Sequence, residues 1–169
     1  MVMNMNHVLY EVSSKYELLF FIPYIVMFLI AIFLLIRYKL DDNENLQNNI
    51  IFKRFIGGFV CLAVFSIFGL LGQIHMYNKI VKAYEQGNYQ TVEGYVENFD
   101  PMPHEGHKHE SFDINGVSFS YSDFAIQPGY HNAKSHGGVI TGNGQHLKIG
   151  YVYYNSAEGN IIVYIEKLD

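Results

Sequence analysis

Two long apolar segments constrain the fold of this chain more than any other feature. Residues 18–36 (LLFFIPYIVMFLIAIFLLI) carry no charged side chain, and neither do residues 55–74 (FIGGFVCLAVFSIFGLLGQI). A helix needs roughly 20 apolar residues to cross about 30 Å of hydrocarbon, so both segments are long enough. The rest of the 169-residue chain is too small to bury two such helices in a soluble core. We therefore predict transmembrane helices at residues 18–36 and 55–74, joined by a loop at 37–54.

The first segment has the features of a retained anchor rather than of a cleaved signal peptide. Residues 1–17 precede it and are mostly polar, and no small-x-small cleavage site follows its long apolar stretch. We expect residues 1–17 to form an N-terminal tail.

Basic side chains near the predicted spans favour one orientation. Four lie at the two ends of the predicted loop: Arg37, Lys39, Lys53 and Arg54. Three are nearest to the spans on the other side: Lys15, Lys79 and Lys82. Because Lys and Arg close to the spans favour the cytoplasm, we expect a multi-pass protein of the inner (plasma) membrane with a cytoplasmic loop. The region after the spans would then be periplasmic or extracellular, although a margin of four to three leaves the reverse orientation open.

The second apolar segment contains more small residues than the first. They are Gly57, Gly58, Ala63, Ser66, Gly69 and Gly72. Small residues allow the backbones of neighbouring helices to approach closely. Packing against the first span and homo-oligomerisation through residues 55–74 account for them equally well.

After the second span the apolar spacing stays helical to about residue 87 and then changes to a period of two. We predict a helical linker at residues 75–87 and a β-rich domain at residues 88–169. Asn115-Gly116 is a type I′ turn dipeptide between two alternating stretches, so it predicts a hairpin that pairs Ile114 with Val117 and Phe112 with Phe119. Further strands are expected around Val92, from Leu147 to Tyr153 and over residues 161–168, with a possible short strand at residues 139–141.

These patterns predict a membrane-anchored α+β protein. Its two transmembrane helices would be followed by a small, mostly antiparallel, five- or six-stranded OB-like β-barrel. Five or six strands suit a barrel better than a sandwich of seven or more, and closure would remove exposed sheet edges.

The charge of residues 75–169 excludes one class of partner. This part of the chain has six Lys or Arg against eleven Asp or Glu, a net charge of −5. So acidic a surface repels phosphate backbones, and we predict no nucleic-acid binding.

A short histidine-rich stretch is the main candidate for a metal site. His104, His107 and His109 lie in the segment PHEGHKHE, and neutral imidazole suits zinc, copper or nickel. A polar loop between strands would have the same composition. Cys61 is the single cysteine, so a thiolate zinc site or a disulfide within one chain is ruled out. No other cofactor is indicated beyond zinc or copper at these histidines.

No catalytic motif is evident. Ser135-His136 has the residue types of a nucleophile and its base, but neighbours in a chain seldom point at each other, and no G-x-S-x-G motif is present. We predict that the protein is not an enzyme. Seven tyrosines of the β-rich domain either pack in its core or stack a flat small-molecule ligand: Tyr95, Tyr121, Tyr130, Tyr151, Tyr153, Tyr154 and Tyr164.

Three strings in the last part of the chain carry a resemblance. They are YVENFDPMP at residues 95–103, GVSFSYSD at residues 116–123 and SHGG at residues 135–138. The chain resembles a group of uncharacterised bacterial two-helix membrane proteins with a small β-barrel tail, and this resemblance implies an architecture without an activity. Its layout is also similar to the two-transmembrane β-barrel effectors of anti-phage defence, in which the barrel binds a cyclic nucleotide and the spans disrupt the membrane.

Three functions remain open at this point. The first is a non-enzymatic, membrane-tethered β-barrel binding module that faces away from the cytoplasm and holds a protein or small-molecule ligand. The second, implied by the layout resemblance, is a ligand-gated membrane-disrupting effector. The third is an envelope metal-binding protein, which depends on His104, His107 and His109 alone.

Overall fold

The chain forms two compact units. A computed structural model describes residues 7–13, 21–40, 50–106, 108–125 and 127–168. One unit, here called the helical unit, is Lys15–His75. The other, here called the β-unit, combines Met1–Ser14 with Met76–Asp169. The β-unit is therefore built from one segment that precedes the helical unit in the sequence and one that follows it.

Two long apolar helices occur where the sequence predicts them. Helix α1 spans Ile22–Leu40, and helix α3 spans Ile50–Glu85 without a break. Both are long and apolar enough to cross a membrane, and only 6% and 11% of their most apolar windows are buried. Large side chains such as Phe33 and Phe65 are 60% and 75% exposed. Most of the residues in these two apolar windows are therefore not buried within the described structure.

The small residues of α3 differ in their surroundings within the helical unit. A Cβ atom added at Gly69 would lie 3.7 Å from the ring of Tyr24, so this glycine lies close to α1. Gly57, Gly58 and Gly72 have no described neighbour within 4 Å of such a Cβ atom. Packing against α1 thus accounts for Gly69, and homo-oligomerisation through residues 55–74 stays a prediction.

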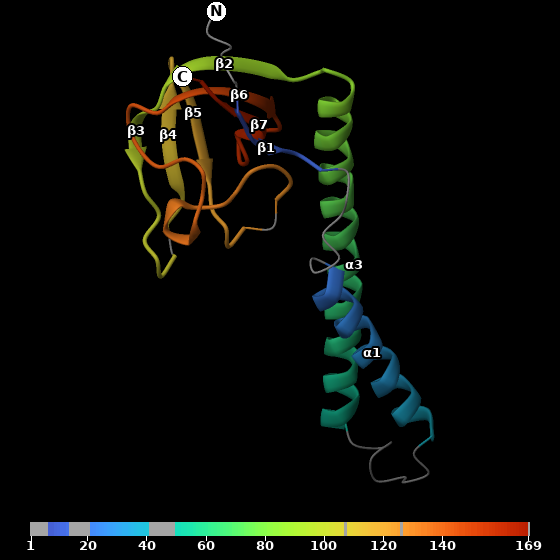
Figure 1. The fold of residues 1–169 in the computed structure, drawn as a ribbon. Coiled ribbons are helices and arrows are strands. Elements are labelled where there is room, and N and C mark those ends of the chain that lie inside the picture. The colour runs from blue at the N-terminus through green and yellow to red at the C-terminus, as the bar shows by residue number, and fades with distance from the viewer. Residues whose placement is uncertain (1–6, 14–20, 41–49, 107, 126, 169) are drawn as a thin grey trace, which may run out of the picture. The chain divides into compact units, whose positions relative to one another are not determined.

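The β-unit contains two mostly antiparallel sheets (Figure 1). The four-stranded sheet has the order β1-β7-β6-β2. Its strands are β1 (His7–Glu11), β7 (Asn160–Lys167), β6 (His146–Tyr153) and β2 (Gln90–Tyr95). The three-stranded sheet has the order β3-β4-β5. Its strands are β3 (Glu97–Asp100), β4 (Glu110–Ile114) and β5 (Val117–Tyr121).

The β4–β5 hairpin confirms the register predicted from its turn. Ile114 is paired with Val117 and Phe112 with Phe119. Asn115 and Gly116 have positive φ angles of 47° and 80°, as a type I′ turn requires. Because the turn sets the register, alternate side chains point into the core, and the intervening Ser and Asp side chains lie on the opposite face.

Strand β1 lies within the residues expected to form an N-terminal tail. Glu11 is paired with Tyr164 of β7, and the backbone N–H of Val12 donates to the carbonyl of Val163 at 2.9 Å. The segment HVLYE is short and has no turn signal, so its pairing depends on a partner far away in the sequence. The β-unit therefore includes strands from both sides of the two helices.

The last turns of α3 pack on the four-stranded sheet. Ile80 and Val81 are buried in a cluster with Val12, Ile161 and Val163. The Tyr84 hydroxyl also donates to a carboxylate oxygen of Glu11 at 2.6 Å. The helical continuation to Glu85 thus occupies the residues predicted as a linker, and these residues belong to the core of the β-unit.

A second cluster fills the space between the two sheets. Its buried members include Phe112, Phe119, Leu147, Ile149 and Ile165. The two sheets are connected at Val96, because β2 ends at Tyr95 and β3 begins at Glu97. With two long helices and two mostly antiparallel sheets, the fold belongs to the α+β class. Neither sheet is closed on itself, and the OB-like barrel stays a prediction.

The possible strand at residues 139–141 is absent from the described structure. The side chain of Gln145 holds this stretch instead. Its amide oxygen accepts from the N–H of Thr141 at 2.9 Å, and its amide nitrogen donates to the carbonyl of Val139 at 3.0 Å. A side chain thus satisfies backbone groups that a neighbouring strand would otherwise satisfy.

Candidate functional site

The histidines predicted to bind metal do not form one group in the described structure. His104 is exposed in the loop between β3 and β4, whereas the Nδ1 atom of His109 lies 3.3 Å from the hydroxyl of Ser120 on β5. His107 lies outside the described residues. No group of three or more His, Cys, Asp or Glu side chains that could hold a metal ion occurs in the described part of the chain. The set His104, His107 and His109 stays a prediction.

His104 instead lies beside a histidine from a different loop. The ring centres of His104 and His136 are 4.6 Å apart, with an angle of 42° between the ring planes. The Nδ1 atom of His136 is 2.6 Å from the Oδ2 atom of Asp123. We call His104, His136 and Asp123 the histidine cluster. It combines residues that are 13 and 32 positions apart in the sequence.

Local backbone geometry places His136 in this cluster. The 3-10 helix η2 spans Lys134–His136 and ends at Gly137, whose φ angle is 89°. Next, Gly138 passes so close to the preceding chain that an added Cβ atom would lie 2.2 Å from the carbonyl oxygen of Asn132. A side chain is sterically excluded there. The two glycines therefore allow the sharp turn that follows His136.

A buried glutamate holds both loops of the cluster. Glu110, at the start of β4, is 0% exposed. Its Oε2 atom accepts from the backbone N–H of Lys134 at 3.0 Å and from that of Met102 at 3.4 Å. Lys134 and Met102 each lie two residues before a histidine of the cluster. The Glu110 carboxylate thereby fixes both loop backbones to the hairpin.

Two tyrosines complete the surroundings of Glu110. The hydroxyl of Tyr121 donates to its Oε1 atom at 2.7 Å. Burial, together with this hydrogen bond, raises the pKa of Tyr121 well above its usual range. Burial likewise raises the pKa of Tyr130 to about 12, and its hydroxyl accepts from the N–H of Val139 at 2.6 Å. Both phenols stay neutral at physiological pH and act as fixed hydrogen-bonding groups.

Two polar atoms beside His136 are buried without a hydrogen-bond partner in the described structure. They are the second carboxylate oxygen of Asp123, Oδ1, and the hydroxyl oxygen of Ser135. Most buried polar groups in proteins are hydrogen-bonded, so each exception needs an explanation. The Ser135 hydroxyl is not bonded to His136, so this geometry does not assemble a nucleophile with its base.

The electrostatic arrangement defines what His136 can do. A carboxylate only accepts hydrogen bonds, so its contact with Asp123 places a proton on Nδ1 of His136. In the neutral ring the lone pair is then on Nε2, where it can bind a metal ion or accept a proton. The His136 and Asp123 side chains are 32% and 17% exposed, so solvent reaches the pair.

An aromatic side chain borders the cluster. The ring of Phe124 makes an edge contact with His136, with 6.1 Å between ring centres. A Cβ atom added at Gly106 would lie 2.8 Å from the Phe124 ring, so the ring packs directly on that backbone. Phe124 is otherwise 68% exposed. It links the loop that carries His104 to the segment that carries Asp123.

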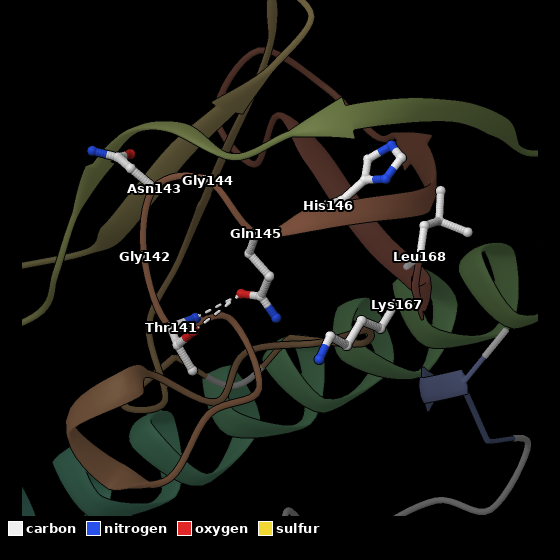
Figure 2. Close-up of a pocket in the computed structure, with 8 residues that line it drawn as sticks. All are labelled: Thr141, Gly142, Asn143, Gly144, Gln145, His146, Lys167 and Leu168. Atoms are coloured by element: carbon white, nitrogen blue, oxygen red, sulfur yellow. Dashed lines mark hydrogen bonds between the residues drawn. The ribbon is translucent and has the colours of Figure 1, made fainter. Parts of the chain in front are cut away.

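A separate hollow of about 460 Å³ lies at the glycine-rich loop before β6 (Figure 2). It is lined by residues 141–146 together with Lys167 and Leu168. Figure 2 shows the Gln145 amide bonded back to Thr141 of the same loop. The ring of His146 stacks on that of Tyr95 at 4.6 Å. The amide of Gln145 thus serves the loop itself, and His146 and Lys167 supply the ionisable groups of this hollow.

A second hollow, of about 540 Å³, lies over the outer face of the β4–β5 hairpin. Its lining includes Asp113, Ser118 and Ser120 of the hairpin and Glu158 of the β6–β7 loop. Hydrogen bonds from Ser118 and Asn98 hold the pKa of Asp113 below its usual range. We call this hollow the polar groove. It is acidic and rich in hydroxyl groups.

The seven tyrosines divide between the core and the surface. Tyr121, Tyr130 and Tyr151 are buried, whereas Tyr95 and Tyr153 are each 58% exposed. Tyr154 and Tyr164 are partly exposed. Packing accounts for the buried tyrosines. Only the exposed or partly exposed tyrosines among the seven could therefore stack a flat ligand.

Comparison with protein-family models, curated proteins and solved structures finds no match to this chain. The site therefore depends on its geometry alone. The sequence pointed to His104 but not to its partner, because His136 and Asp123 reach it through tertiary contacts. The sequence also gives no sign that Glu110, the last residue of the histidine-rich segment, is buried, because nothing in the pattern distinguishes it from its polar neighbours.

Proposed function

We propose that the protein is a non-enzymatic binding module tethered to the membrane, with α1 and α3 crossing the bilayer and the β-unit outside the cytoplasm. The observation that carries this proposal is the pairing of β1 with β7. Strand β1 precedes α1 in the chain and β2 follows α3, and both strands belong to one sheet. The folded β-unit would thus be held by two chain connections.

Exposed apolar side chains support the bilayer as the surroundings of the helices. Both helices have the length and composition of spans, and few of their residues are buried. Arg37 and Lys39 lie in the last turn of α1, and Lys53 and Arg54 lie near the start of α3. Under the positive-inside rule this end would be cytoplasmic, which leaves the β-unit on the opposite side.

We also propose that the β-unit is a partly open, OB-like barrel. On one side the two sheets are continuous through Val96. On the other, β5 lies near β7, and the side chain of Asn160 donates to the carbonyl of Ser118 at 3.0 Å. Between β5 and β7, this side-chain hydrogen bond takes the place of a ladder of backbone hydrogen bonds. A barrel with one such unpaired junction between strands is partly open.

The polar groove is the surface that we assign to partner binding. Its hydroxyl and carboxylate groups suit a polar or basic segment of a protein, or a small ligand with hydrogen-bond donors. Its acidity disfavours nucleic acid, in line with the net charge of the region. A groove on the hairpin also lies on rigid strands, which favours a preorganised site.

Reporter fusions test the orientation. Alkaline phosphatase, and separately a fluorescent protein that folds only in the cytoplasm, are fused after Leu168. An active phosphatase with a dark fluorescent fusion is the expected result. The matched control inserts each reporter between α1 and α3, within residues 41–49, where the opposite pattern is expected. A bright fluorescent fusion after Leu168 would place the β-unit in the cytoplasm and overturn the proposal.

One observation favours a second candidate, the ligand-gated membrane effector. Helix α3 is unbroken from Ile50 to Glu85, and its final turns belong to the core of the β-unit. A ligand that altered this core would therefore act directly on the second span. This candidate requires growth arrest on overexpression of the full chain and its relief in Ile80→Asp, which disrupts that core contact. Harmless overexpression of the full chain with a cytosolic cyclic nucleotide present would exclude it.

A further inference from the structure

We propose that His104 and His136 together bind one divalent transition-metal ion, with Asp123 orienting the His136 ring. This site differs from the run of three histidines suggested by the sequence, because it joins two loops and excludes His109. The inference stands on the geometry of the histidine cluster and does not depend on the orientation of the β-unit.

The distance between the two rings fits a shared ion. Two imidazoles that bind one ion through nitrogen at about 2 Å have ring centres roughly 5 Å apart. The observed separation of 4.6 Å is close to this value, and the 42° tilt departs from a parallel stack. One ion could therefore bind both rings with small adjustments of the side chains.

Asp123 supplies the supporting interaction that metal-binding histidines commonly have. Such histidines donate their second ring N–H to a carboxylate or a carbonyl, which fixes the tautomer and increases the basicity of the ligating nitrogen. The contact of 2.6 Å between Asp123 Oδ2 and His136 Nδ1 has this form. It leaves Nε2 of His136 as the ligating atom.

The unpartnered atoms beside His136 are a second, independent observation. Asp123 Oδ1 and the hydroxyl oxygen of Ser135 are both buried without a hydrogen bond in the described residues. A hydrated ion at the cluster would bring water molecules, and a small rotation of the Asp123 side chain would let one of them donate to the buried Oδ1. Stacking of the two rings alone would not explain why Asp123 Oδ1 is buried without a hydrogen bond.

The donor set indicates which ions the site prefers. The site has two imidazole nitrogens. No group of three or more His, Cys, Asp or Glu side chains that could hold a metal ion occurs in the described residues, so water would fill the remaining coordination positions. At a site with so little imposed geometry, affinity follows the general order copper(II) above nickel(II), with zinc(II) below copper(II). We therefore expect an exchangeable site that binds copper(II) most tightly.

The test uses the full chain, purified in detergent with an affinity tag that contains no histidine. Copper(II) is titrated by calorimetry, and its nitrogen ligands are counted from the hyperfine structure in electron paramagnetic resonance spectra. The expected result is one ion per chain with two imidazole nitrogens. His104→Ala and His136→Ala should each lower the affinity at least tenfold and remove one nitrogen, and Asp123→Asn should lower it about tenfold.

His109→Ala is the matched control, because this histidine belongs to the same segment but contacts Ser120. It should bind copper(II) as the unmodified chain does. His136→Gln preserves the size of the side chain and serves if His136→Ala fails to fold, as judged by thermal unfolding without metal. Unchanged affinity in a folded His104 or His136 variant would overturn the proposal. So would a loss in His109→Ala equal to that in His104→Ala.

Discussion

The backbone N–H of Lys134 donates to both carboxylate oxygens of Glu110, at 3.2 and 3.0 Å, although the two residues are 24 positions apart in the sequence. This contact attaches helix η2 to the start of strand β4. It places a carboxylate in a position with no exposed surface. The stability of the β-unit and the position of His136 therefore depend on the same buried group.

Removal of the Glu110 carboxylate should destabilise the protein strongly. Glu110→Ala leaves the Lys134 N–H and the Tyr121 hydroxyl without an acceptor, and each unsatisfied buried group costs about 1–3 kcal/mol. We expect the free energy of unfolding to fall by about 3 kcal/mol or more, and by less in Glu110→Gln, which retains one acceptor oxygen. Urea unfolding followed by tyrosine fluorescence measures this, since the chain has 14 Tyr and no Trp. Exposed Glu158→Ala is the control, and an equal loss there would refute the role given to Glu110.

Gly138 should tolerate no side chain. An added Cβ atom would lie 2.2 Å from the Asn132 carbonyl oxygen and 2.8 Å from the Ala133 carbonyl carbon, both backbone atoms that cannot move away cheaply. Gly138→Ala should therefore lower stability by about 3 kcal/mol or more. The neighbouring Gly137 has open space and only an unfavourable φ angle of 89°, so Gly137→Ala should cost about 1 kcal/mol. Thermal unfolding of both variants compares the two effects, and similar losses would contradict the steric argument.

Asp113 should make the hairpin sensitive to acid. Hydrogen bonds from Ser118 and Asn98 hold its pKa below the usual value of 3.8. The stabilisation from this carboxylate is complete above pH 3.8 and is lost as the pH falls through the lowered pKa of the folded state. Asp113→Asn should remove this part of the acid dependence, and Asn98→Ala should reduce it. Unfolding curves between neutral pH and pH 2.5 test this, and an unchanged acid slope in Asp113→Asn would count against it.

Tyr130 should contribute to the loss of stability in alkali. Burial raises its pKa from 10.0 to about 12. Its contribution is complete below pH 10.0, the ordinary value for the unfolded chain, and disappears as the pH rises through about 12. The absorbance of tyrosinate in a pH titration should show late ionisation that is reduced in Tyr130→Phe. Early ionisation of all tyrosines in the folded chain would show that Tyr130 is not buried in this way.

The parts of the fold that could be predicted were those set by local sequence. The β4–β5 hairpin followed from Asn115-Gly116 because the turn dipeptide and the alternation of side chains specify the same register. The two helices followed from uninterrupted apolar segments. In each case the information lies within a few neighbouring residues, and packing of the chain reinforces it.

The parts that could not be predicted depend on contacts between distant residues. The sequence of strand β1 contains no turn signal and no clear alternation of apolar and polar residues, and its pairing depends on β7. The pairing of His104 with His136 requires Glu110 to bring two loops together, while the sequence draws attention to the adjacent histidines His107 and His109. Glu110 itself looks like one more polar residue of a histidine-rich loop, and only the folded chain shows it to be buried.

The division of the β-unit between two chain segments has a consequence for biosynthesis. Strand β1 leaves the ribosome before the two helices, and its partner β7 leaves it after them. The four-stranded sheet therefore cannot assemble until both helices have been made, and until then β1 is a strand without a neighbour. If the helices enter the bilayer as they are synthesised and the proposed orientation holds, β1 crosses the membrane early and must stay free of other strands until β7 arrives. Completion of the four-stranded sheet would then mark the point at which both helices have been synthesised.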